Sequence, residues 1–229
     1  MSNIKIENVE VYGFRHALRA MRNPMDSWDR IDSFPVADLT DPLYRENVEN
    51  VLIGPKDLEL VLKLVKAGSE HSKFLRCIMV YFDLTAPRYV LTEFDTYKVG
   101  TVRNSCSTMH KLGKRPLVPE DFAQPEDNEE LEWLMETINY LNTLGSLYRE
   151  TKKYNIVKKM KRALPEGFLQ KASFCMNYAV LLNMFLQRKG HRLDEWRLTD
   201  GTKEESICNW IKSLPYMAQI IAVKEKKND

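Results

Sequence analysis

Two stretches of the chain have the residue pattern of β-strands. Apolar residues alternate with polar ones over Ile4–Val11, with one slip in the period between Ile6 and Val9. The stretch Cys77–Leu84, CIMVYFDL, is rich in β-branched and aromatic residues, which favour a buried strand. Pro87 should limit how far this second strand extends, because proline cannot donate a backbone hydrogen bond.

Helical spacing of apolar residues marks three further stretches. Gly54-Pro55 opens the first of them, since proline suits the first turn of a helix, and Gly68 should close it. The residues at helical spacing are Leu58, Val61, Leu62 and Val65 in the first stretch, Leu131, Leu134, Met135, Ile138 and Leu141 in the second, and Ile207, Trp210, Ile211 and Leu214 in the last.

Prolines separate these elements. Residues 20–48 and 116–125 combine prolines with polar or acidic residues, and both predict irregular connections. Leu164-Pro165 should break a helix that restarts over Gln170–Lys189 and ends with Gly190 as its C-cap. Several helices with few strands predict an α+β fold, with helices packed around a small β-sheet in a single domain over residues 1–229.

Composition narrows the class of protein. A chain of 229 residues is long enough for one sizeable core, and its net charge of +2 argues against a strongly basic nucleic-acid binder. No apolar run approaches the length of a membrane span, and the first ten residues lack the core of a signal peptide. The four cysteines are scattered without a CxxC pair, so we expect no zinc site and no disulfide framework. A reducing cytoplasm is the expected location.

One stretch, Glu93–His110, is almost entirely polar and predicts a loop that is neither helix nor strand. Lys98 and Arg103 supply cations, and Gly100 permits close approach of a ligand to the backbone. The hydroxyls in this stretch that could donate to a ligand are Thr101, Ser105, Ser107 and Thr108. These groups suit a phosphate or a polar ring, although a solvated turn with self-capping hydroxyls has the same composition.

The stretch HSKFLRCIMVYFDLTAPRYVLTEFDTYK resembles the flavin-dependent thymidylate synthases, the ThyX family. That family has a His before a strand, then Pro-x-x-Val-x-x-Gln, then the signature Arg-His-Arg-x-x-Ser. Without a gap, His71, Pro87 and Val90 lie on the family's His, Pro and Val. Glu93 takes the position of the Gln, and Thr96-Tyr97-Lys98 take that of Arg-His-Arg.

A second stretch, KRALPEGFLQKASFCMNYAVLLNMFLQR, resembles the C-terminal motif of the same family. Lys161 lies on the Arg that precedes Leu-Pro, Leu164-Pro165 match, Asn177 matches the Asn, and Arg188 matches the closing Arg. The resemblance covers about residues 55–220, and chains with this variant signature look like proteins carried by phages and prophages of Gram-positive bacteria.

The resemblance implies a homotetramer that holds FAD and dUMP in sites built from several subunits. The family transfers a methylene group from methylenetetrahydrofolate to dUMP and reduces it with hydride from NADPH. The nucleotide-binding candidates carried over are Glu93, Lys98, Ser105, Ser107, Lys161 and Arg188. The cofactor-binding candidates are His71, Thr96, Tyr97, Lys98, Asn104 and Asn177. We further expect Arg188 to point into a cleft between subunits, with Lys161 and Asn177 nearby.

This chain also departs from the family at positions that carry charge. Thr96 and Lys98 replace two guanidinium groups by a hydroxyl and a point charge. Glu93 replaces an amide by an anion that would repel a phosphate, and Ala179 stands where the family commonly has an Arg. These substitutions argue against ordinary thymidylate synthesis.

Several candidates have simpler structural explanations. Arg188 also suits a helix C-terminus, and Lys161 belongs to the basic run KKMKR, which is typical of a solvated helix face. His71 suits a structural histidine as well as an acid or base. Tyr97 could stack on a base or a flavin ring, or only pack against the protein.

Two classes of function therefore compete. One is a divergent flavin-dependent enzyme that acts on a pyrimidine nucleotide. The other is a homologue without flavin chemistry that sequesters a signalling nucleotide on behalf of a phage. A structural phage protein is a weaker third hypothesis, because it would not need the preserved spacing.

Overall fold

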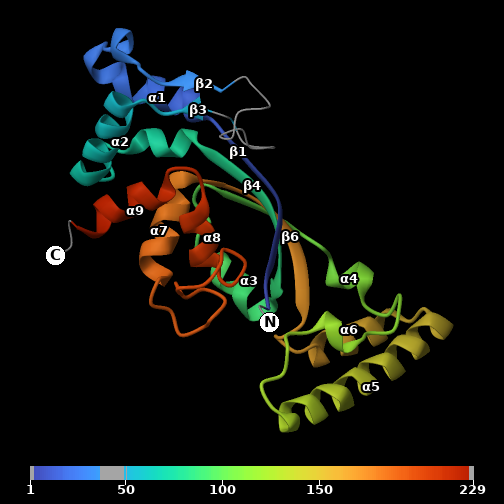
Figure 1. The fold of residues 1–229 in the computed structure, drawn as a ribbon. Coiled ribbons are helices and arrows are strands. Elements are labelled where there is room, and N and C mark those ends of the chain that lie inside the picture. Colours follow the sequence, from blue (N-terminus) through green and yellow to red (C-terminus); the bar gives the residue numbers. More distant parts are fainter. Residues whose placement is uncertain (1–2, 37–48, 50, 227–229) are drawn as a thin grey trace. The chain divides into compact units, whose positions relative to one another are not determined.

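The computed structural model describes residues 3–36, 49 and 51–226 of the chain. Its strands are β1 (Lys5–Tyr12), β2 (Phe34–Pro35), β3 (Val51–Leu52), β4 (Met79–Pro87), β5 (Thr101–Ser105) and β6 (Leu169–Asn177). Its α-helices are α1 (Phe14–Arg22), α2 (Pro55–Ala67), α3 (Arg88–Phe94), α4 (Thr108–Lys111), α5 (Asn128–Thr151), α6 (Tyr154–Ala163), α7 (Tyr178–Arg188), α8 (Ile207–Ser213) and α9 (Met217–Glu225). The predicted mixture of helices and sheet is confirmed (Figure 1).

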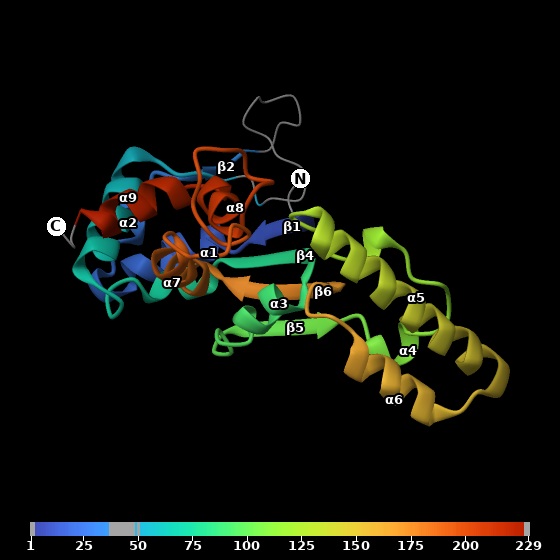
Figure 2. The same cartoon turned by 90° about the horizontal axis from the view of Figure 1, so that it is seen from below.

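Four strands form one sheet in the order β1-β4-β6-β5 (Figure 2). The strands β2 and β3 pair antiparallel in a second, short sheet. The slip in the alternation of β1 has a local cause. Asn8 adopts a left-handed φ of 52°, so one extra residue shifts the later side chains to the opposite faces, as in a β-bulge.

The chain divides into two compact units whose segments are interleaved in sequence. Unit 1 comprises residues 1–5, 84–96 and 104–173, and unit 2 comprises residues 6–83, 97–103 and 174–229. In unit 1, α6 packs against α4 and α5. In unit 2, α9 packs against α2 and α8, and α7 packs against α8 (Figure 1). The expectation of a single domain stays a prediction.

Each unit has its own apolar core. In unit 1, Leu134, Ile138 and Leu141 of α5 are buried together with Met160 of α6. In unit 2, the rings of Phe82 and Phe174 stack at 5.2 Å between centroids, and Trp210 of α8 lies 4.5 Å from Phe82. Most residues of the predicted apolar stripes face these cores, but Leu131 and Met135 of the α5 stripe are exposed, so that part of the prediction was wrong.

Two predictions about local structure were wrong. Residues 170–177 form strand β6 rather than helix, and only α7 after Asn177 is helical. Alternate residues Ala172, Phe174 and Met176 are buried, so the strand has a period of two that a short apolar run does not reveal. The helix is capped by Lys189, not by Gly190.

The polar stretch Glu93–His110 is also not a simple loop. It contains the end of α3, all of β5, and most of α4. The strand β5 lies at the edge of the sheet, and its Val102 side chain is 66% exposed. An edge strand exposed to solvent does not need alternating apolar residues, which explains why its sequence resembled a loop.

The long irregular connection predicted for residues 20–48 holds only in part, because α1 extends to Arg22 and two short 3-10 helices follow. Residues 37–48 lie outside the described part of the chain. The helix α9 after the last predicted stripe was not predicted.

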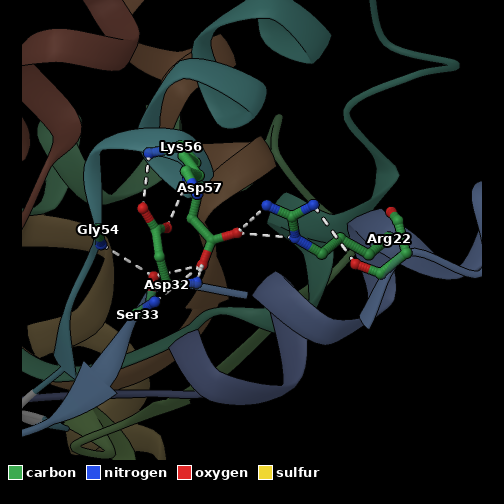
Figure 3. Close-up of polar contacts among 7 residues, drawn as sticks. Arg22, Asp32, Ser33, Gly54, Lys56 and Asp57 are labelled. Carbon is green, nitrogen blue, oxygen red and sulfur yellow. Dashed lines mark hydrogen bonds and ion pairs between the residues drawn. The ribbon is translucent and has the colours of Figure 1, made fainter. Parts of the chain in front are cut away.

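A buried ion pair fixes the start of α2 in unit 2 (Figure 3). One oxygen of Asp57 accepts hydrogen bonds from the Arg22 guanidinium, from Nε at 2.8 Å and Nη2 at 2.5 Å. Its other oxygen accepts from the backbone N–H of Asp32 and from the backbone N–H and hydroxyl of Ser33. Asp32 in turn accepts from the N–H groups of Lys56 and Asp57, so the loop before β2 is tied to the first turn of the helix.

Candidate functional site

Helix α7 carries two of the predicted site residues at its two ends. Asn177 is the N-cap, and its side-chain oxygen accepts a hydrogen bond of 3.1 Å from the Val180 N–H. Arg188 is the last residue of this 11-residue helix, about 16 Å from the N-cap at 1.5 Å per residue. Within one chain Asn177 and Arg188 therefore lie a helix length apart, and their meeting in a cleft between subunits stays a prediction.

The Arg188 side chain is held in one orientation by three neighbours in unit 2. Its Nε donates a hydrogen bond of 3.0 Å to the Tyr97 hydroxyl, and its Nη1 lies 2.8 Å from Nε2 of His191. The guanidinium carbon lies 5.7 Å from the centre of the Tyr97 ring and 5.3 Å from that of Trp196, at cation–π distances. A long flexible cation is thereby fixed before any ligand arrives.

Tyr97 links the signature segment to the end of α7. Its hydroxyl accepts from Arg188 and donates to Oε1 of Gln187 at 3.0 Å. The Tyr97 side chain is 7% exposed, so of the two roles left open for it the structure shows the packed one. Its ring stacks on a cation of the same chain.

Behind Arg188, Cys208 of α8 is fully buried. Burial raises the pKa of the Cys208 thiol to about 12, although the positive charge of Arg188 acts in the opposite direction. The thiol therefore stays protonated at neutral pH and serves as a small apolar residue beside the guanidinium.

The remaining candidates of unit 2 lie in turns. Lys98 is exposed. Two residues later, Gly100 has a left-handed φ of 77°. Only glycine fits there, because a Cβ atom would lie 2.7 Å from Nδ2 of Asn177. This close packing sets the turn that presents Lys98. His71 is exposed in the turn after α2.

In unit 1, one predicted residue lines a cavity of about 560 Å³. Ser107 contributes to it together with Thr108, Lys111 and Lys171, and Leu112 and Phe168 supply apolar walls. Backbone hydrogen bonding places this end of the polar stretch, because the Cys106 N–H donates to the Lys171 carbonyl at 2.8 Å. Hydroxyls, lysines and an apolar wall can together hold a phosphate and a flat ring.

The other candidates of unit 1 do not line this cavity. Glu93 lies on α3 and its carbonyl accepts from the Thr96 hydroxyl at 2.8 Å, while Asn104 and Ser105 end β5. Lys161 is exposed in the last turn of α6. Sequence analysis missed Lys111, although the run KLGK after His110 already offered two cations close to Ser107.

Two absences bear on the class of site. Within the residues that the structure describes, no three His, Cys, Asp or Glu side chains gather as metal ligands. In the same part of the chain, no helix is both long enough and apolar enough to span a membrane.

The arrangement of elements is that of the flavin-dependent thymidylate synthases. The chain superposes on thymidylate synthase X (ThyX) from Helicobacter pylori, crystallised with FAD and dUMP, with a TM-score of 0.63 and 17% sequence identity over 98% of this chain and 100% of that one. A second ThyX structure from H. pylori, also with FAD and dUMP, gives a TM-score of 0.61 and 18% identity over 96% of this chain and 99% of that one.

A related enzyme has the same fold. The UMP/dUMP methylase PolB from Streptomyces cacaoi, bound to 5-Br dUMP, matches with a TM-score of 0.57 and 16% identity over 99% of this chain and 94% of that one. No protein-family model and no curated protein sequence matches the chain. At these identities the likeness establishes the fold, and it confirms the resemblance inferred from the sequence at that level.

Proposed function

We propose that this chain binds a pyrimidine nucleotide of the dUMP type and that Arg188 is the cation that contacts its phosphate. The observation that carries the proposal is the fixed Arg188 side chain, whose Nε donates to the Tyr97 hydroxyl and whose guanidinium lies within cation–π distance of two aromatic rings. A guanidinium already oriented loses little entropy when it binds a phosphate, which favours affinity. The H. pylori ThyX structures named above were crystallised with FAD and dUMP, and the PolB structure with 5-Br dUMP.

Unit 1 by itself offers a further set of polar groups that suits a nucleotide. The cavity with Ser107 and Lys111 offers hydroxyls and ammonium groups to an anion, and Phe168 offers an apolar face to a base. The remaining candidates, Glu93, Lys98, Ser105 and Lys161, extend the proposed nucleotide site across subunits in an oligomer in the cytoplasm of a bacterial host.

The proposal does not include ordinary thymidylate synthesis, because the signature positions do not suit a flavin diphosphate. Tyr97 is buried against Arg188, and the Thr96 hydroxyl donates to the Glu93 carbonyl. Of the three signature positions, only the Lys98 side chain presents a charge. In the alternative, a flavin-dependent enzyme, the chain would bind FAD, with further contacts from His71, Asn104 and Asn177. Because Tyr97 is hydrogen-bonded to Arg188 and packed against it, we favour the second function, a protein that sequesters a nucleotide without converting it.

Expression of this chain in a thymidine-requiring bacterial strain is expected not to restore growth without thymidine. Thr96 and Lys98 replace the two guanidinium groups that would hold a cofactor phosphate by bidentate hydrogen bonds, so the cofactor would be misplaced. A misplacement of about 1 Å can lower a rate on the order of a hundredfold. The H. pylori enzyme expressed in the same strain is the positive control.

This chain, once purified, should be colourless, yet dUMP should bind to it in calorimetry. Robust growth, or a yellow protein with stoichiometric flavin, would show that the enzymatic alternative is correct.

Helix α5 carries a stripe of exposed apolar side chains that suits contact with another subunit. Trp133, Tyr140 and Leu147 follow one another at seven-residue intervals, so they lie on nearly one stripe of the helix. Each of the three is exposed, at 53%, 53% and 46% respectively. Large apolar side chains gathered on one stripe are typical of a protein–protein interface. We propose that a second copy of this chain covers this stripe in a homo-oligomer, as the expected tetramer requires.

Replacing both Trp133 and Tyr140 with glutamate is expected to shift the protein from an oligomer to a smaller species in sedimentation velocity at micromolar concentration. Two carboxylates buried without partners would oppose association by several kcal/mol. Lys158→Glu, a charge change at an exposed position of α6, is the control and should leave the sedimentation coefficient unchanged. A wild-type chain that sediments as a monomer while it binds dUMP would contradict the expected oligomer.

A further inference from the structure

Unit 2 contains a second cavity, of about 770 Å³, between α1 and the short sheet of β2 and β3. We propose that this cavity binds a small flat aromatic molecule that carries a phosphate or carboxylate group. Arg15, His16 and Arg19 are among its lining residues, as are the aromatic residues Tyr12 and Phe34. None of the residues around Arg188 lines this cavity, so the inference goes beyond the proposed nucleotide site.

The cationic side comes from one helix. Arg15 and Arg19 are one helical turn apart on α1, and both are exposed together with His16. In residues 3–36, 49 and 51–226, no carboxylate pairs with Arg15 or His16. Arg19 is braced by Trp28, with its guanidinium carbon 5.1 Å from the centre of the ring. Arg15 and Arg19, on one face of the helix, create a positive potential that favours an anion.

Among the residues that the structure describes, one carboxylate lines the cavity, and it is bound to backbone N–H groups rather than to these arginines. Glu49 accepts hydrogen bonds from the backbone N–H groups of Gly13 at 2.6 Å, Phe14 at 2.7 Å and Arg15 at 3.3 Å. Its negative charge is thus bound to the N-terminus of α1, where the helix dipole stabilises it. The ligand would therefore meet the guanidinium groups, because the helix end is already occupied.

The aromatic side suits a flat ring. Tyr12 is 44% exposed and Phe34 is 53% exposed, although both rings border a cavity and could be covered by a ligand. Exposed aromatic faces beside arginines combine stacking with charge attraction, which is how proteins hold a ring that carries an anion. The volume is in the range of small-molecule sites, so a nucleotide-sized ligand fits.

The inference can be tested by calorimetry with two aromatic anions, AMP and pterin-6-carboxylate, which differ in ring and in anionic group. The Arg188→Ala variant serves as the protein, so that binding at the proposed dUMP site does not contribute. We expect saturable binding of at least one probe, and at least about tenfold weaker binding when Arg15 and Arg19 are both replaced with glutamine. Adenosine, which has the ring without the phosphate, should bind at least about tenfold more weakly than AMP if AMP is the ligand.

Two controls keep this result interpretable. Arg30→Gln removes an exposed cation that does not line the cavity, and it should leave the affinity unchanged. Phe34→Ala tests the aromatic side without any change of charge, and it should weaken the same probe. If the double arginine variant does not fold, as judged by its melting curve, Arg15→Gln alone replaces it. Absence of binding for both probes, or equal affinity in the arginine variants, would overturn the inference, and neither outcome depends on dUMP binding.

Discussion

Replacing Arg188 with alanine is expected to weaken dUMP binding by about one to two orders of magnitude. A charge-assisted hydrogen bond to a phosphate contributes roughly 1.5–3 kcal/mol, and each 1.4 kcal/mol is about tenfold in affinity. The loss should be large because Arg188 is fixed by Tyr97 and His191 before the ligand binds, so little of its interaction energy is lost to ordering the side chain.

Two variants separate charge from orientation in the same titration. Arg188→Lys keeps the charge but cannot donate from Nε to the Tyr97 hydroxyl, so it should bind dUMP with intermediate affinity. Tyr97→Phe keeps the ring and removes only the hydroxyl that orients Arg188, and it should lower affinity for dUMP while leaving affinity for deoxyuridine unchanged. Arg192→Ala, a nearby exposed arginine, is the control. Unchanged dUMP affinity in Arg188→Ala would place the phosphate elsewhere.

Replacing Asp57 with alanine is expected to lower the free energy of unfolding by about 3–5 kcal/mol. Asp57 is fully buried and Arg22 is 5% exposed, so the substitution would leave a buried guanidinium without its partner. The backbone N–H of Ser33 and that of Asp32 would also lose their acceptor, and an unsatisfied buried donor costs about 1–3 kcal/mol. This cluster therefore holds the loop before β2 as well as the start of α2 (Figure 3).

Urea unfolding followed by circular dichroism measures this effect. Glu59→Ala, an exposed carboxylate on the same helix, should change stability by less than about 0.5 kcal/mol. The double variant Arg22→Met with Asp57→Leu removes both charges, so it should recover part of the loss, because an apolar pair can replace a buried ion pair at little cost. A loss of less than about 1 kcal/mol in Asp57→Ala would mean that water reaches Arg22 and compensates its charge.

The spacing of apolar residues was sufficient to predict a helix or strand wherever one side of the element faces a core and the other faces water. The stripe of α2 and the inner part of the α5 stripe could be predicted, since Val61, Val65, Leu134 and Ile138 are buried on one helical face. Pattern failed for β5, which is polar because it lies at the edge of the sheet. It failed again for β6, whose buried residues fit a helical run as well as a strand.

The candidate site shows the same division. The sequence predicted one helix that contains Asn177 and Arg188, whereas in the structure Asn177 ends β6 and caps α7, and only Arg188 belongs to the helix. Spacing could not show that the two lie a helix length apart, nor that Asn177 serves as a cap. It left the role of Tyr97 open, and burial against Arg188 decided that role.

The sequence by itself determined the class of fold and the residues at family positions, because periodicity and spacing are properties of the chain alone. Only the tertiary structure decided which charges meet. Arg22 and Asp57 are far apart in sequence, as are Tyr97 and Arg188, yet each pair is in hydrogen-bond contact. Such contacts depend on how distant elements pack, and no local pattern records that packing. The buried Asp57 in the first turn of α2 is the clearest case, because nothing in its local sequence indicates its partner Arg22.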